Sequence, residues 1–120
     1  MKTAKMKFSS PEPITRAELK DRLAAEDVNV SAEALIRMSL WETDWEWAET
    51  VCLTALNSDK KEVRTAALIA LGHLARRFRD LHLDLVILAI SKLLDDPDYQ
   101  GAAEDALDDI AVFSRRQHVH

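Results

Sequence analysis

The feature that most constrains the fold is an apolar pattern that appears twice, 36 residues apart. Its first copy lies in residues 62–78, EVRTAALIALGHLARRF, where apolar residues recur at spacings of three and four. Such spacing forms one side of an α-helix, and Ala and Leu are strong helix formers. The equivalent positions are Val63, Ala66, Ala67, Leu71, Leu74 and Ala75, then Tyr99, Ala102, Ala103, Leu107, Ile110 and Ala111. A repeat of this length predicts stacked helical pairs, because one pair cannot bury its apolar side alone.

The helices that precede these two copies also correspond, at a spacing of 37 residues that sets Leu56 over Leu93 and Cys52 over Ala89. Thr15 with Glu18 forms a capping box for a first helix, Ser31 is the expected N-cap of a second, and Thr43 or Asp44 caps a third. The expected helices span residues 16–26, 32–40, 45–56, 62–78, 83–94 and 99–114. The fifth is apolar on nearly every side, which predicts a helix buried between others.

Composition supports an all-α class, because the chain has only 2 Gly and 3 Pro among 120 residues. We expect one domain over residues 14–114, a flexible lead-in over residues 1–13 and a tail over residues 115–120. Cys52 lies on an apolar helix side, so we expect a buried thiol in a reducing compartment. No stretch approaches the roughly 18 apolar residues of a membrane span, so the default expectation is a soluble cytoplasmic protein without membrane contact.

Residues 59–75, DKKEVRTAALIALGHLA, resemble a HEAT repeat, and in particular its second helix. The residues that carry the resemblance are Asp59, Val63, Arg64, Ala66, Ala67, Leu71 and Gly72. It implies a short right-handed α-α solenoid of about three hairpins, with a ladder between turn Asp and helix Arg of adjacent repeats. The second copy has Gln100 in place of Arg and Asp108 in place of Gly, which is typical of a terminal, capping repeat.

Charge is distributed in bands along the chain, with +1 over residues 1–27, −4 over 28–60, +3 over 61–92 and −5 over 93–120. This pattern argues against nucleic-acid binding, which needs a continuous basic patch. It suits either a protein partner with a basic surface or simply a well-solvated exterior. A DNA-binding alternative would use the basic residues Lys60, Lys61, Arg64, Arg76, Arg77 and Arg79. We expect those residues to be solvated instead.

The sequence contains none of the common motifs for nucleophilic, phosphate-transfer or metal-dependent catalysis, so it predicts no enzyme, no cofactor and no metal site. His73 is expected on the polar, solvated side of its helix.

Two segments are candidates for binding a partner. The first contains Trp41, Glu42, Asp44, Glu46 and Trp47, where Trp anchors inside an acidic rim would suit a basic partner. Trp45 is expected in the core, while Trp41 and Trp47 could be core or interface. The second contains Glu104, Asp105, Asp108 and Asp109 on the last helix, which could equally serve as a solubilising end cap.

A small acidic helical protein of this kind is similar to bacterial immunity proteins, including those of contact-dependent growth inhibition. This resemblance implies a non-catalytic protein that occludes a basic toxin domain, such as a nuclease. The alternative is a HEAT-like scaffold or regulatory subunit that assists an enzyme.

Overall fold

The computed structural model describes the backbone of residues 12–118 and the side chains of residues 12–113. Within this range the chain forms six α-helices and no strand, which confirms the all-α prediction. The helices are α1 (Arg16–Leu23), α2 (Val28–Trp41), α3 (Trp45–Ala55), α4 (Lys61–Arg77), α5 (Leu83–Ser91) and α6 (Gln100–His118). None of these helices has the length and apolar character needed to cross a membrane.

The expected lead-in of residues 1–13 falls outside the described residues except at its end. There the carbonyls of Glu12 and Pro13 each accept a hydrogen bond of 2.9 Å from the Arg37 guanidinium. At the other end, α6 continues to His118, four residues beyond the expected end at Ser114.

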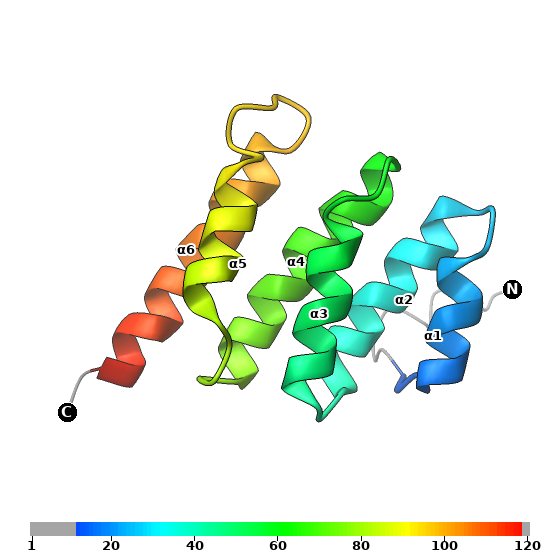
Figure 1. Cartoon of the computed structure of the whole chain (residues 1–120), viewed down its shortest axis with the longest axis horizontal. Coiled ribbons are helices and arrows are strands. Elements are labelled where there is room, and N and C mark those ends of the chain that lie inside the picture. Colours follow the sequence, from blue (N-terminus) through cyan, green and yellow to red (C-terminus); the bar gives the residue numbers. More distant parts are fainter. Residues whose placement is uncertain (1–11, 119–120) are drawn as a thin grey trace, which may run out of the picture.

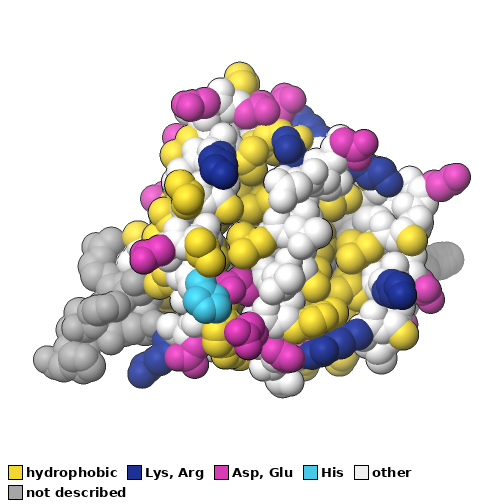
Figure 2. Space-filling view, viewed as in Figure 1, with side chains coloured by type: hydrophobic (Ala, Val, Ile, Leu, Met, Phe, Trp, Pro, Cys, Tyr) yellow, Lys and Arg dark blue, Asp and Glu magenta, His cyan; other side chains and the backbone are white. Residues whose placement is uncertain are grey.

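The helices form two layers, with α1, α3 and α5 in front and α2, α4 and α6 behind (Figure 1). The most extensive contacts join α2 to α4 and α4 to α6, while each front helix packs mainly on the back layer. Hydrophobic side chains remain visible across the front of the molecule (Figure 2). The back layer therefore holds most of the core, and the front layer covers it incompletely.

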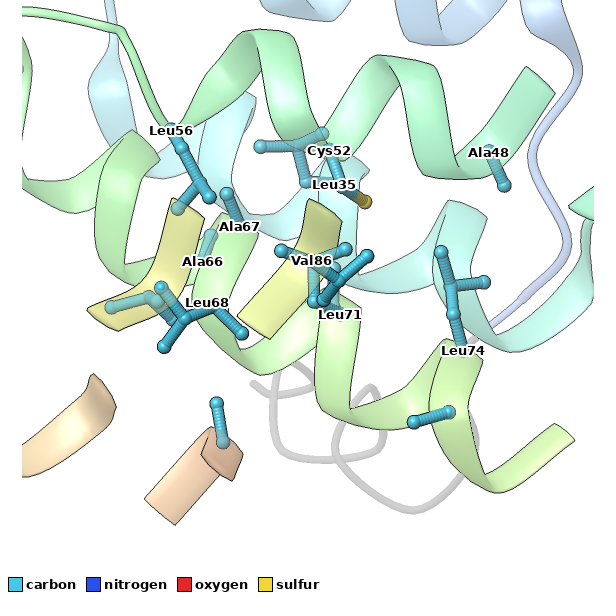
Figure 3. Close-up of a cluster of buried hydrophobic side chains, with 14 of the residues drawn as sticks. Leu35, Ala48, Cys52, Leu56, Ala66, Ala67, Leu68, Leu71, Leu74 and Val86 are labelled. Carbon is cyan, nitrogen blue, oxygen red and sulfur yellow. The ribbon is translucent and has the colours of Figure 1, made fainter. Parts of the chain in front are cut away.

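Helix α4 is the centre of the core, as the sequence predicted. Nine of its residues are buried, and they include Ala67, Leu71 and Leu74. Leu35 of α2, Cys52 of α3, Leu71 of α4 and Val86 of α5 gather there (Figure 3). Burial of a Leu or Val side chain contributes about 1.5–3 kcal/mol, so this cluster supplies much of the driving force for folding.

The start of α2 differs from the prediction. Asp27 caps this helix by accepting a 2.9 Å bond from the Asn29 N–H, so α2 begins four residues before the expected start at Ala32. Ser31 is buried inside the helix, and its hydroxyl donates to the Arg22 carbonyl of α1 at 2.8 Å. The predicted Ser31 cap was wrong because this hydroxyl joins two helices instead of starting one. The other caps are as predicted, with a full capping box at Thr15 and with Asp44 at α3.

Burial follows the predicted repeat in the back layer. Val63, Ala67, Ala70 and Leu74 of α4 correspond at 36 residues to Tyr99, just before α6, and to Ala103, Ala106 and Ile110 of α6, and all eight are buried. Ser31, Ala34, Leu35, Met38 and Ser39 of α2 match buried α4 positions 32 residues later. The same burial pattern therefore occurs on three helices, α2, α4 and α6, although the apolar repeat in the sequence covered only the last two.

The front layer departs from the predicted register. Buried Ala48 and Cys52 of α3 correspond to buried Val86 and Ile90 of α5, at a spacing of 38 residues. The predicted spacing of 37 sets Cys52 over Ala89, which is only half-buried. Because α5 is apolar on nearly every side, its sequence could not show which side faces the core.

Helix α4 is also joined to the end of α2 by hydrogen bonds. The Ser39 hydroxyl donates to the Ile36 carbonyl at 2.7 Å, so its oxygen accepts from His73 Nδ1 at 3.0 Å. Arg77 donates to the Ser39 carbonyl at 2.8 Å, which satisfies one of the last carbonyls of α2. His73 is therefore half-buried and bonded to α2, and the prediction of a solvated His73 was wrong.

Candidate partner-binding surfaces

The acidic Trp segment joins the end of α2 to the start of α3. Arg16 of α1 reaches across to it and pairs with Glu42 at 3.1 Å and with Asp44 at 3.2 Å. Glu42 also accepts from the backbone N–H groups of Thr43 and Asp44, and Asp44 caps α3 through the Trp47 N–H. Both carboxylates are therefore used to hold the chain together at this corner.

These bonds change the acidity of both carboxyl groups. Burial opposes ionisation of Glu42, but the hydrogen bonds from Arg16 and from the Asp44 N–H outweigh it and lower its pKa. The pKa of Asp44 is lowered first by the hydrogen bond from the Trp47 N–H and then by Arg16. Both groups are therefore stabilised as carboxylates within the fold.

The three tryptophans have different environments. Trp47 packs partly against the core, and the Arg16 guanidinium lies 4.2 Å from the centre of its ring. Trp45 packs against the core as predicted, with its ring 5.5 Å from that of His82. Trp41 is 48% exposed at the last position of α2. Trp47 is thus part of the packing, and Trp41 is the tryptophan with substantial exposed surface.

The four acidic residues of α6 do not act as one group. Asp109 turns toward α4, where Arg76 donates to both of its carboxylate oxygens at 3.1 and 3.2 Å. Its carboxylate lies over Gly72, where a Cβ atom would come within 3.1 Å of Asp109 Oδ2. Glu104, Asp105 and Asp108 are exposed. Asp109 therefore joins two helices, and the other three acids face solvent.

The largest exposed apolar surface on one helix lies on α5, where the sequence predicted burial. Only Val86 and Ile90 of this helix are buried. Leu85 is 57% exposed, Leu88 58% and Ile87 39%. We call these three residues the α5 ridge.

The chain around this ridge is strongly acidic. Residues 80–118, which we call the acidic hairpin, contain nine Asp or Glu residues, one Lys and two Arg, a net charge of −6. The remaining residues carry 13 basic and 12 acidic side chains, a net charge of +1. The whole negative charge of the protein therefore comes from the part of the chain that carries α5.

A buried carboxylate joins α3 to the start of α5. Glu49 is 4% exposed, and it accepts from the backbone N–H of His82 at 2.7 Å and from His82 Nδ1 at 2.7 Å. The hydrogen bond and the charge of Glu49 raise the pKa of His82. The first turn of α5 is thus held by a charge-assisted bond rather than by packing alone.

The basic residues considered for DNA binding are mostly engaged within the described chain. Arg76 pairs with Asp109, Arg77 bonds to the Ser39 carbonyl, and Lys61 lies 3.8 Å from Asp98. The Arg64 guanidinium lies 5.2 Å from the centre of the Tyr99 ring. These positions do not form a continuous exposed strip.

Residues 12–113 also contain no group of three or more His, Cys, Asp or Glu side chains arranged to hold a metal ion. Cys52 is fully buried, and burial together with the nearby Glu49 raises its pKa to about 12. The thiol is therefore a packing residue, as the sequence indicated.

Similarity to a known protein is found among solved structures. No family model matches the sequence, and no curated protein is similar to it. Among solved structures, a chain in the crystal structure of the CDI (contact-dependent growth inhibition) complex from Cupriavidus taiwanensis LMG 19424 superposes with a TM-score of 0.80. The two sequences are 31% identical over 89% of this chain and 95% of that chain. This chain belongs to the same family as that protein. Because the match spans nearly all of both chains, it cannot be limited to one helical hairpin.

Proposed function

We propose that this chain is an immunity protein that binds and neutralises the toxin domain of a contact-dependent growth inhibition system. The observation that carries the proposal is the 31% identical chain in the Cupriavidus CDI complex, which is covered over 95% of its length. The sequence alone led to the same class of protein, through its small helical fold and its acidic net charge of −5. This chain would bind the toxin domain in the cytoplasm.

Neutralisation would occur by occlusion. A protein with an acidic, partly apolar surface can cover a basic active site, such as that of a nuclease, and prevent its substrate from entering. Opposite charges also speed association, which suits an inhibitor that must act before the toxin does.

The fold that supports this role is a short HEAT-like solenoid of three helical hairpins. Support comes from the buried positions that recur after 32 and 36 residues in α2, α4 and α6. The HEAT-repeat resemblance implies contacts between turn Asp and helix Arg residues of adjacent repeats. Other contacts join the corresponding regions here, because Arg64 lies over the Tyr99 ring and Lys61 lies near Asp98.

Co-expression tests the proposal. The C-terminal domain of the exoprotein encoded directly upstream is induced in a host with and without this chain. We expect growth arrest without the chain, full growth with it, and copurification of the two proteins. Growth arrest caused by this chain itself would mean that it is the toxin. Failure to protect, with copurification of an enzyme subunit instead, would support the scaffold alternative.

A further inference from the structure

We infer that the α5 ridge is the docking surface for the toxin domain, and that the matching surface of the toxin has an apolar centre with basic residues around it. This inference rests on the proposed function and identifies the part of the molecule that performs it. It was not foreseen from the sequence, which placed α5 in the interior.

The first observation is the position of the ridge. By helical geometry, with about 100° between successive residues, Leu85 and Leu88 lie about 60° apart on the side of α5 opposite to buried Val86 and Ile90. Ile87 lies farther round the helix. In the front view, hydrophobic side chains cover the surface over α5, and acidic side chains gather over the turn between α5 and α6 (Figure 2). Large apolar side chains exposed together on one short helix are typical of interaction surfaces.

The second observation is the charge around the ridge. Asp84 lies on α5 itself, Asp95 lies in the turn that follows, and both are exposed. Glu104 and Asp108 point away from the buried line of α6 and lie on its free edge, at the end of the stack. Apolar anchors inside a charged rim are the usual arrangement of a protein interface, and an acidic rim selects a basic partner.

The same charge argues against a second copy of this chain as the occupant. Two α5 ridges in contact would bring two acidic hairpins together, each with a net charge of −6. Like charges placed opposite each other at an interface cost several kcal/mol. A different protein with a basic surface would instead be attracted to the acidic hairpin.

The test measures the affinity of the purified upstream toxin domain for three forms of the full chain. The ridge variant carries Leu85→Gln and Leu88→Gln, which keep the net charge and suit an exposed helix position. The control carries Ile69→Gln on α4, where Ile69 is 42% exposed in the other layer. Circular dichroism and thermal unfolding establish that all three forms are folded.

We expect the ridge variant to bind at least a hundredfold more weakly than the natural chain, and the control to bind within threefold of it. Equal binding by all three forms would overturn the docking surface but leave the immunity role intact. Absence of binding by the natural chain would instead overturn the proposed function. If the double variant does not fold, Leu88→Gln alone replaces it, with about a tenfold loss expected.

Self-association provides an independent outcome. Sedimentation of the natural chain alone should show a monomer at the concentrations used for binding. A dimer that the ridge variant abolishes would assign the ridge to a second copy and overturn the inference.

Discussion

The two acidic regions of this protein look alike in sequence but differ in structure. At the corner between α2 and α3, Glu42 and Asp44 are bonded to Arg16 and to backbone N–H groups. In the acidic hairpin, Glu104, Asp105 and Asp108 of α6 are exposed, and so are Leu85 and Leu88 of α5. The first region uses its charge to hold three helices together, whereas the second presents its charge outward.

The difference teaches that acidic residues beside apolar ones do not by themselves indicate an interface. Acidic residues indicate an interface only where no Lys or Arg from elsewhere in the chain pairs with them. Arg16 reaches the corner from 26 residues away, and Arg76 reaches only Asp109 of the four acids on α6. The predictions below test this difference in order of expected size.

The largest expected effect is on the attachment of the acidic hairpin. Glu49→Ala removes the acceptor of two 2.7 Å bonds from His82, so the free energy of unfolding should fall by about 2–3 kcal/mol. Urea unfolding measures this change. The control is Glu46→Ala, an exposed position on the same helix, which should stay within about 0.5 kcal/mol of the natural protein. Equal losses for both variants would mean that Glu49 does not anchor α5.

The next effect concerns binding of the toxin domain. Changing Glu104, Asp105 and Asp108 to Ser should weaken binding about tenfold, mainly through slower association, and should reduce the salt dependence of the affinity. Surface plasmon resonance at several salt concentrations measures both changes. The charge-matched control changes three exposed acids outside the hairpin, Glu33, Glu46 and Glu62, to Ser. If the control weakens binding equally, only overall charge matters.

A smaller effect is expected at the corner. Arg16→Ala removes two ion pairs and uncovers the ring of Trp47, so stability should fall modestly, and by less in high salt. Tryptophan emission should shift to longer wavelength as the indole becomes more exposed. Lys20→Ala, at an exposed position of the same helix, is the control and should change neither property. Unchanged emission in the Arg16 variant would contradict the stacking of Arg16 on Trp47.

The smallest effect is on pH dependence. Because Glu49 raises the pKa of His82, the stabilisation from protonated His82 is complete below the unfolded value of about 6.5 and is lost as pH rises through the folded value. The stability difference between the natural protein and His82→Gln should therefore shrink as pH rises above about 6.5.

His73 provides a comparison of opposite sign. Burial, followed by the charge of Arg76, lowers its pKa, so the contribution of neutral His73 is present above about pH 6.5 and is lost as pH falls through the folded value. The difference from His73→Gln should therefore shrink toward acidic pH. Parallel pH profiles for the two variants would contradict the assigned environments.

The sequence predicted the core helices well because the apolar residues of each helix lie on one side of it. Helix α4 begins and ends within one residue of the expected bounds, and α3 does so as well. The start of α2 could not be predicted, because Asp27 and Ser31 are both good caps. The choice depends on the Arg22 carbonyl, which only the packed α1 brings within reach of Ser31.

The candidate site was predictable in composition but not in detail. The acidic residues were identified, but their pairing depends on contacts between residues 26 and 33 positions apart. The α5 ridge was missed because an apolar pattern around the whole helix contains no information about which side faces out.

Gly72 has a further consequence for how the last helix is placed. The Asp109 carboxylate fits over α4 at the one residue without a side chain, 3.1 Å from where a Cβ atom would be. A slide of α6 by one turn, about 5.4 Å, would bring that carboxylate against Leu68 or Arg76 instead. The absence of a side chain at Gly72 therefore fixes the position of α6 along its axis relative to α4. The position of α5 is fixed with it.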